Sequence, residues 1–258
     1  MNMAKKQVKN FGKRNVYTIA VLIILAVSTL YIKNKFFRTP FKYYSEFGID
    51  LPVNFSVHGI DVSHYQQDID WKLVKSMKVK NIGIDFAFIK ATEGTSYVDA
   101  EFENNMQGCK ENDIKRGAYH YLLSSKSGKT QASNFIENVK LSKGDLAPVL
   151  DVEQNTGVTT EQLQAIIKDW LDVAEQHYNI KPIIYCNIDY YQKYIAGKFD
   201  EYPIWIAHYL VKDKPRMNNN WVFWQHNEHG HITGIRATDV DFNVFNGGKW
   251  GLDSYCLQ

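Results

Sequence analysis

Leu150-Asp151-Val152-Glu153 follows directly on the apolar run of residues 147–150, which is typical of a buried strand. Side chains alternate faces along a strand, so Asp151 and Glu153 are expected to project to the same side. Two carboxylates in a partly desolvated place cannot both ionise freely, and the one with the raised pKa can act as a general acid near neutral pH. Cleavage of a glycosidic bond requires such a pair. The alternative is a helix cap or an ion pair at a strand end.

The chain of 258 residues is long enough to bury one large core, and 45% of it is hydrophobic. Its net charge of +2 hides an asymmetry, because residues 1–42 contain nine of the 30 Lys and Arg residues and no Asp or Glu. The remainder therefore carries 21 basic and 28 acidic residues. A domain this acidic is a poor candidate for binding nucleic acid. The nine basic residues are Lys5, Lys6, Lys9, Lys13, Arg14, Lys33, Lys35, Arg38 and Lys42.

The N-terminal segment has the pattern of a targeting element. Residues 16–32 form an uncharged, mostly apolar run at the short end of a membrane-spanning helix. The excess of basic residues before it predicts a cytoplasmic tail (1–15), a transmembrane signal anchor (16–32) and a stalk (33–56). The catalytic domain then lies outside the cytoplasm, in the periplasm or at the cell surface. A cleaved signal peptide, which would give a secreted protein, and a buried helix are the alternatives.

Neither the cysteines nor the histidines form a recognisable metal-binding pattern. Cys109, Cys186 and Cys256 are an odd number without metal spacing, and Cys186 lies in an apolar strand pattern. Four histidines near predicted strands raise a zinc hypothesis, but no HExxH motif is present. We therefore expect no metal and no cofactor. The four histidines are His58, His64, His120 and His208.

From residue 57 the chain alternates short apolar runs with amphipathic stretches, which predicts repeated βα units with parallel strands. Eight such strands predict a TIM-like β/α barrel over 57–248, with about five helices and a short tail over 249–258. Thr159 and Gln162 form a capping box at the start of the clearest helix. The expected strands are 57–61, 82–90, 116–123, 147–153, 182–187, 203–209, 221–226 and 240–245. The expected helices are 70–77, 100–112, 130–141, 159–174 and 190–196.

Acidic and aromatic residues follow nearly every predicted strand at its carboxyl end, where barrels of this type gather their sites. A single such residue is weak support for a site, but eight strand ends together are difficult to assign to solubility alone. The strand-end residues are Asp61, His64, Glu93, Tyr119, Tyr121, Asp151, Glu153, Tyr185, Trp205, His208, Tyr209, Trp224, Gln225 and Asp241.

These segments resemble the glycoside hydrolase family 25 lysozymes, the Chalaropsis-type N-acetylmuramidases. They occur in the family's order over about residues 57–246. The resemblance implies a β/α barrel with five helices and three closing strands, and hydrolysis of the β-1,4 bond from N-acetylmuramic acid to N-acetylglucosamine in peptidoglycan. The matching segments are 59–66 (GIDVSHYQ), 88–94 (FIKATEG), 116–121 (RGAYHY), 150–153 (LDVE), 203–209 (PIWIAHY), 223–226 (FWQH) and 240–245 (VDFNVF).

By this resemblance Glu153 is the general acid, and Asp151 orients or stabilises the substrate's own 2-acetamido group, which implies retention of configuration. Asp61 and Asp241 match further acids of the same pocket, and Asp239 competes with Asp241 for that position. Tyr65 stands where Trp is frequent in the family, and Tyr121 stands where Phe is frequent. The residues expected to bind sugar are Glu93, Tyr65, Tyr119, Tyr121, Tyr185, Trp205, His208, Tyr209, Trp224 and Gln225.

The expected partners are peptidoglycan glycan strands and, through residues 16–32, a membrane; the catalytic domain is expected to be a monomer. Two other classes stay open at this point. A glycan-binding module without turnover would keep the barrel, although all four acids are present. A metal-dependent polysaccharide deacetylase would lose activity with a chelator and release acetate. Glu93 has a structural alternative as well, because Lys90 is close enough in sequence to form an ion pair with it.

Overall fold

The structure is a computed structural model that describes residues 15–29, 31, 40–209, 211, 213–217, 221–236 and 239–258. One compact unit, Phe41–Val211 with Pro215–Gln258, contains all the strands described below. Residues 1–14 of the tail predicted over 1–15 and residues 33–39 of the predicted stalk lie outside the described residues.

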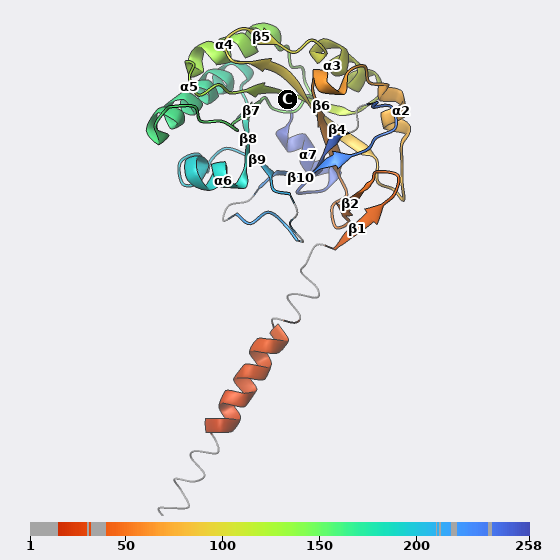
Figure 1. Cartoon of the computed structure of the whole chain (residues 1–258), viewed down its shortest axis with the longest axis vertical. Helices are drawn as coiled ribbons and strands as arrows, with labels where there is room; N and C mark the ends of the chain where they lie inside the picture. Colours follow the sequence, from red (N-terminus) through yellow and green to blue (C-terminus); the bar gives the residue numbers. More distant parts are fainter. Residues whose placement is uncertain are drawn as a thin grey trace, which may run out of the picture. The chain divides into compact units, whose positions relative to one another are not determined.

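Eight strands close into a barrel (Figure 1), as the sequence predicts. The ring closes because β3 pairs with β4 on one side and with β11 on the other. A short ninth strand, β5 (Tyr97–Val98), extends the sheet beside the end of β4. The barrel strands are β3 (His58–Val62), β4 (Ile84–Glu93), β6 (Lys115–Tyr121), β7 (Val149–Asp151), β8 (Ile183–Asn187), β9 (Ile204–Ala207), β10 (Phe223–Gly230) and β11 (Val240–Phe245).

The barrel strands from β3 to β10 run parallel to one another, but β11 is antiparallel to both β10 and β3. The short β5 outside the ring is antiparallel to β4. The expectation of parallel strands therefore fails at the last barrel strand. A parallel pair needs a crossover of a dozen or more residues, and only residues 231–239 separate β10 from β11. Because β11 is reversed, its first residues, including Asp241, lie at the barrel end where the parallel strands finish.

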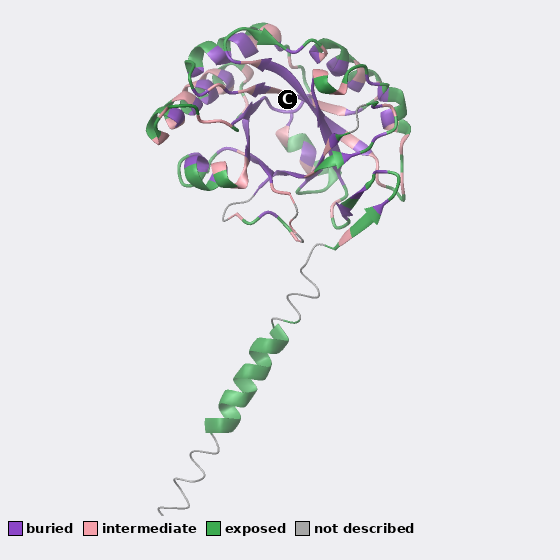
Figure 2. Cartoon of the chain, in the orientation of Figure 1, coloured by how far each residue is buried: buried purple, intermediate pink, exposed green. Residues whose placement is uncertain are grey.

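Helices cover the outside of the barrel and bury one side against it, as the purple inner faces in Figure 2 show. The predicted capping box is present, since Thr159 Oγ1 accepts from the Gln162 amide and Gln162 Oε1 accepts from the Thr159 amide. The predicted last helix is α6 (Ile188–Tyr190) followed by a π-helical turn, Tyr191–Ile195. The other helices are α2 (Trp71–Ser76), α3 (Phe102–Glu111), α4 (Gly128–Asn138), α5 (Thr160–Tyr178) and the C-terminal α7 (Lys249–Leu252).

Residues alternate between two separate apolar layers. Leu150 and Val152 pack under the helices, whereas Val149 belongs to the cluster that fills the barrel. Phe86 and Phe88 of β4 also point inward, and a Cβ atom at Gly59 would lie 2.5 Å from the Phe86 ring. Because Gly59 has no side chain, the Phe86 ring can occupy this space at the bottom of the barrel.

Two segments that the sequence placed outside the barrel domain belong to the same compact unit as the barrel. Residues of the predicted stalk form the hairpin of β1 (Phe41–Tyr44) and β2 (Ile49–Pro52), and Phe47 and Leu51 are fully buried. The predicted tail contains α7 and a 3-10 turn, Asp253–Tyr255. Cys256 forms an antiparallel backbone bridge with Leu146, which precedes β7 in the sequence. The tail therefore closes the end of the barrel where the parallel strands begin.

The membrane-spanning helix predicted over 16–32 is not supported. Residues 15–29 are helical and exposed, while residues 30 and 32 lie outside the described part of the chain. Among the described residues, no helix combines the length and the hydropathy that crossing a membrane requires.

Replacing Leu51 with Ala is expected to lower the free energy of unfolding by about 2–5 kcal/mol, because its buried side chain leaves a cavity. Tyr43→Ala is the matched control on the same hairpin. The Tyr43 side chain is 61% exposed, so a change within about 0.5 kcal/mol is expected. Denaturant unfolding measures both. A Leu51→Ala variant as stable as the control would show that the hairpin is a detachable stalk.

Candidate active site

A pocket of about 250 Å³ opens at the end of the barrel where β3, β4 and β6 to β9 finish. Nine of the fourteen site residues predicted from the sequence line it, including all four acids. The structure therefore brings together carboxyl groups from β3, from the end of β7 and from the start of β11. The predicted residues that line the pocket are Asp61, Tyr119, Asp151, Glu153, Tyr185, Trp205, Tyr209, Gln225 and Asp241.

Asp61 is the centre of a buried hydrogen-bond network. Its Oδ2 atom accepts from Gln225 Nε2 at 2.8 Å and from Asn243 Nδ2 at 2.7 Å. Trp205 Nε1 donates to Asn243 Oδ1 at 2.7 Å, and Tyr185 donates to Gln225 Oε1 at 2.7 Å. Because an indole nitrogen can only donate, it fixes the Asn243 amide with its NH₂ group toward Asp61. The Asp61 oxygen must therefore accept, which favours its ionised form.

Asp241 lies opposite Asp61 across the β3–β11 pair and shares a hydrogen bond with it. Burial, the charge of Asp61 and this hydrogen bond raise the pKa of Asp241 to about 9. Burial also raises the pKa of Asp61, to about 6, against the opposing effect of the two amide donors. At neutral pH the two carboxyls share one proton, which Asp241 donates to Asp61.

Asp151 and Glu153 form a second pair of acids. Val152 packs under the helices between them, which leaves both carboxyls on the pocket side, as the strand pattern predicts. Burial and the charge of Glu153 raise the pKa of Asp151 well above its ordinary value. The Glu153 side chain is exposed, but surrounding protein still desolvates its carboxyl, which raises its pKa. Asp151 Oδ1 is buried and has no hydrogen-bond partner among the described residues.

Lys90 of β4 supplies a cation close to these acids. Its ammonium binds Glu93 at 2.7 Å, as the structural alternative for Glu93 expected, and lies 5.0 Å from the centre of the Tyr121 ring. The charge of Lys90 lowers the pKa values of Asp151 and Glu153, against the larger effect of burial. From the sequence, Lys90 was expected only as a possible ion-pair partner of Glu93.

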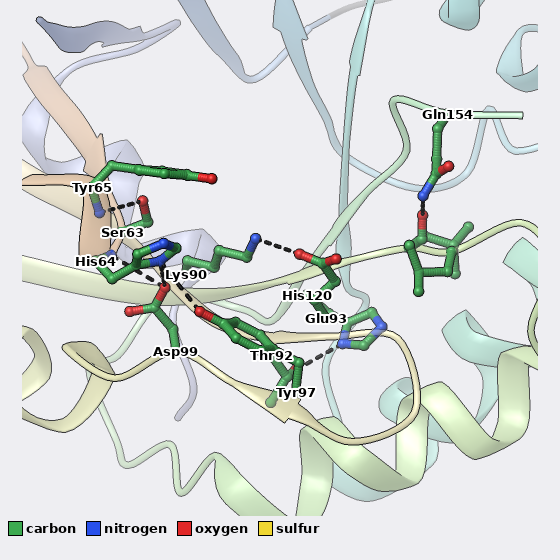
Figure 3. A network of polar contacts seen from close by, with 12 residues as sticks. Ser63, His64, Tyr65, Lys90, Thr92, Glu93, Tyr97, Asp99, His120 and Gln154 are labelled. Atoms are coloured by element: carbon green, nitrogen blue, oxygen red, sulfur yellow. Dashed lines mark hydrogen bonds and ion pairs between the residues drawn. The ribbon is translucent and has the colours of Figure 1, made fainter.

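Figure 3 shows the polar network of this region. The buried Asp99 carboxylate accepts from His64 Nδ1 at 2.7 Å, and the His64 ring packs at a tilt against Tyr65 with ring centres 4.2 Å apart. Tyr65 is 73% exposed, so one face of its ring stays available to solvent. Tyr97 reaches His64 at 3.4 Å and lies 5.7 Å from Lys90. Neither Tyr65 nor Glu93 lines the acid pocket itself.

Three other predicted residues also lie outside the pocket lining. Trp224 is fully buried under the outer layer, and its Nε1 donates to the His208 carbonyl at 3.0 Å. Trp224 is therefore a core residue, and its predicted contact with sugar is wrong. Tyr121 lies under Lys90, and His208 receives a hydrogen bond from the Arg216 amide at its Nδ1. Both Tyr121 and His208 stay near the mouth without lining the pocket.

Glu228 also lines the pocket, although it was not predicted from the sequence. The predicted strand ended at His226, whereas β10 continues to Gly230 through two irregularities in its pairing with β11. A β-bulge shifts the alternation of faces, so a simple period of two could not place this side chain.

The four histidines of the zinc hypothesis each have a hydrogen-bond partner in the protein. His120 Nδ1 bonds Thr92 Oγ1 at 2.7 Å, and burial lowers the pKa of His120 to about 3. His58 Nε2 bonds the Phe55 carbonyl at 3.0 Å. In the described part of the chain, no three His, Cys, Asp or Glu side chains are grouped to hold a metal ion.

Comparisons with known proteins agree with this geometry. The sequence model of the family "Glycosyl hydrolases family 25" matches residues 60–235. The Escherichia coli protein YegX, described as uncharacterized, is 44% identical over 201 residues, which cover 78% of this chain and 74% of the relative. Lysozyme M1 of Streptomyces globisporus is 35% identical over 206 residues, covering 74% of this chain and 68% of the relative.

A solved structure has the same architecture. The family 25 glycosyl hydrolase of Bacillus anthracis superposes with a TM-score of 0.72 at 32% identity. The superposition covers 79% of this chain and 95% of the other.

Asp241→Asn is expected to become more stable relative to the wild type as the pH rises. Folding raises the pKa of Asp241 from 3.8 to about 9, so the folded state keeps a proton that the unfolded chain releases. This raised pKa makes the wild type lose stability across that interval, whereas an Asn amide still donates to Asp61 and does not titrate. Thermal unfolding between about pH 5 and pH 9 measures the difference.

The control is Asp68→Asn, which changes an exposed carboxyl in the same way. Its Tm relative to the wild type should stay constant with pH. If the Tm of Asp241→Asn relative to the wild type also stayed constant with pH, this result would contradict the proton shared by Asp241 and Asp61.

Proposed function

The chain belongs to glycosyl hydrolase family 25, and we propose that it is a muramidase that hydrolyses the β-1,4 bond from N-acetylmuramic acid to N-acetylglucosamine in peptidoglycan. The observation that carries the proposal is the pocket in which Asp61, Asp151, Glu153 and Asp241 meet. The raised pKa values of Asp151, Glu153 and Asp241 favour keeping a proton on these groups, which an acid catalyst needs.

In the proposed first step, Glu153 gives its proton to the glycosidic oxygen as the bond from that oxygen to the anomeric carbon breaks. The carbonyl oxygen of the substrate's 2-acetamido group attacks the same carbon and forms an oxazolinium ring. Positive charge develops on the acetamide nitrogen. Asp151 is the acceptor for that N–H group, because its Oδ1 has no partner among the described side chains.

In the second step, water attacks the anomeric carbon as its bond to the acetamide oxygen breaks, which opens the oxazolinium ring and restores the acetamide. The attacking water gives a proton to Glu153, which restores the enzyme. Two displacements on the same carbon retain its configuration. This route differs from the scheme in which a second carboxylate is the nucleophile, because here the substrate supplies that group.

Substrate binding is proposed to place the proton on Glu153. In the empty pocket, burial strongly raises the pKa of Asp151 and favours a proton there. An acetamide N–H that donates to Asp151 stabilises its charged form and lowers that pKa. The proton of this coupled pair then belongs to Glu153, which is the group that needs it.

Two other functions fit less well. A glycan-binding module without turnover has no need of four carboxyls in a desolvated pocket. A metal-dependent deacetylase needs a set of metal ligands, which the described residues do not supply.

We propose that the catalytic domain works outside the cytoplasm, where peptidoglycan lies, and that residues 16–32 attach it to the membrane. The support is the exposed helix over 15–29, whose side chains are mostly apolar, with Leu22 58% and Ile24 62% exposed. Apolar side chains that are this exposed favour a partner or a lipid surface. Fractionation of cells that make the full chain or a chain starting at residue 40 tests the attachment. Recovery of both in the soluble fraction would contradict it.

The purified protein is expected to solubilise peptidoglycan and to create new reducing ends on muramic acid. New reducing ends on glucosamine would identify a glucosaminidase instead. Mass spectrometry of the reduced muropeptides distinguishes the two.

Glu153→Gln is expected to lower turnover by about 10²–10⁴, because the amide keeps the shape of the side chain and has no proton to donate to a leaving group. Release of soluble muropeptides measures it. Glu103→Gln, an exposed substitution of the same type on α3, is the control and should keep full activity. Equal rates for the two variants would remove Glu153 from the mechanism.

Lys90→Met is expected to move both limbs of the pH–rate profile to higher pH. The charge of Lys90 lowers the pKa values of Asp151 and Glu153, so both rise when that charge is lost. Ionisation of Asp151 sets the acidic limb and protonation of Glu153 sets the basic limb. Lys72→Met on the exposed side of α2 should leave the profile in place. A profile that stays in place in Lys90→Met as well would show that Lys90 acts only in packing.

A further inference from the structure

A second pocket, of about 480 Å³, lies beside the acid pocket and shares no residue with it. One wall is the segment that follows β7, and the other is α6 with the π-helical turn that follows β8. Its volume is in the range of pockets that bind small molecules. Its lining residues are Asn155, Gly157, Val158, Asp189, Tyr190, Lys193 and Tyr194.

This second pocket adjoins the mouth of the barrel. Asn155 is two residues beyond the proposed general acid Glu153. Burial is the main cause that raises the pKa of Tyr121, and the nearby Tyr190 adds to it. Burial lowers the pKa of His208, and the charge of the nearby Asp189 opposes this effect. In Figure 1, α6 lies at the rim next to β8 and β9. A substrate bound at the acids can therefore extend into the second pocket.

The walls of the pocket are held in place by polar contacts. Asn155 Nδ2 donates to the Tyr194 hydroxyl at 3.1 Å, which ties the β7 segment to the π-helical turn. Tyr190 and Tyr194 lie with ring centres 5.1 Å apart and give one wall an aromatic surface. π-Helical turns inside helices occur frequently at functional sites, where they re-aim side chains.

The pocket presents one charge of each sign. Lys193 lies 4.9 Å from the centre of the Tyr194 ring and donates to the Tyr194 hydroxyl. Within the described ranges, neither Lys193 nor Asp189 forms an ion pair. A cation and an anion available on one aromatic-walled pocket are complementary to a ligand that carries both an ammonium and a carboxylate.

The glycan of peptidoglycan carries no ammonium group, but the peptide stem attached to muramic acid contains carboxylates and, in its diamino acid, an ammonium. A stem must start within a few ångström of the muramic acid ring. Each extended residue then reaches about 3.3–3.6 Å further, so the first residues of a stem span the distance to a neighbouring pocket.

We propose that this second pocket binds the peptide stem of the substrate, with Lys193 taking a stem carboxylate and Asp189 a stem ammonium. The proposal rests on the proposed muramidase function. It makes the protein prefer glycan strands that carry stems over strands from which an amidase has removed them.

The test compares kcat/KM on stem-bearing glycan with kcat/KM on stem-free glycan. The wild type is expected to favour the stem-bearing substrate by roughly tenfold, the effect of one or two charge-assisted contacts. Lys193→Met and Asp189→Asn should each reduce this ratio, mainly through KM on the stem-bearing substrate. Lys198→Met is the matched control, because it removes the next exposed lysine along the chain without touching the pocket.

Direct binding gives a second measurement. Free stem tetrapeptide with a diaminopimelate residue should perturb the NMR signals of Tyr190 and Tyr194 in the wild type and not in Lys193→Met. A wild-type ratio near one, or a ratio that Lys193→Met and Asp189→Asn leave unchanged, overturns the stem site. Failure to cleave either substrate is a separate outcome, which overturns the proposed muramidase function.

Discussion

The Asp61 carboxylate, which accepts two side-chain amides on a single oxygen, is the interaction on which the rest of the site depends. Gln225 and Asn243 come from β10 and β11, and Trp205 of β9 sets the direction of the Asn243 amide. The carboxylate therefore ties the closing strands to the first strand of the barrel. Because Asp61 has to accept both amides, the proton of the acidic cluster is left to Asp241 and to the pair at the end of β7. The direction of the buried hydrogen bond from Trp205 to Asn243 thus influences which acids of the pocket hold a proton.

The barrel interior places these acids on an aromatic support. Phe88 stacks on Trp205 with ring centres 4.4 Å apart, and Phe223 packs against Phe86 at 5.2 Å. Trp205 in turn contacts Tyr185 at 4.4 Å, which brings the apolar stack directly beneath the carboxyls. Little water can reach the acids from below, so burial is the largest cause of each raised pKa. Packing at the bottom of the barrel is therefore part of the acid chemistry at its mouth.

The sequence predicted those features that depend on local periodicity. Alternation through β7 and the two residues that follow it places Asp151 and Glu153 on one side, although β7 itself ends at Asp151. The capping box at Thr159 begins α5 where expected. The prediction that Trp224 contacts sugar was wrong, although strand alternation could have corrected it. Adjacent residues of a strand face opposite sides, and Gln225 points into the pocket. The reversal of β11, the burial of the β1–β2 hairpin and the inward position of Glu228 follow from tertiary pairing and a bulge. No local pattern reveals those.

The C-terminal residues close the lower end of the barrel, where Tyr255 packs against Phe223 and Phe245 and the Leu257 amide bonds the Asp145 carbonyl. The barrel interior is therefore closed at its lower end. A sugar ring bound at the mouth would displace the water through which the carboxyls exchange protons with bulk solvent. Turnover then requires the bound sugar to move away from the mouth between the two displacements, so that the nucleophilic water enters by the route along which the departing sugar leaves.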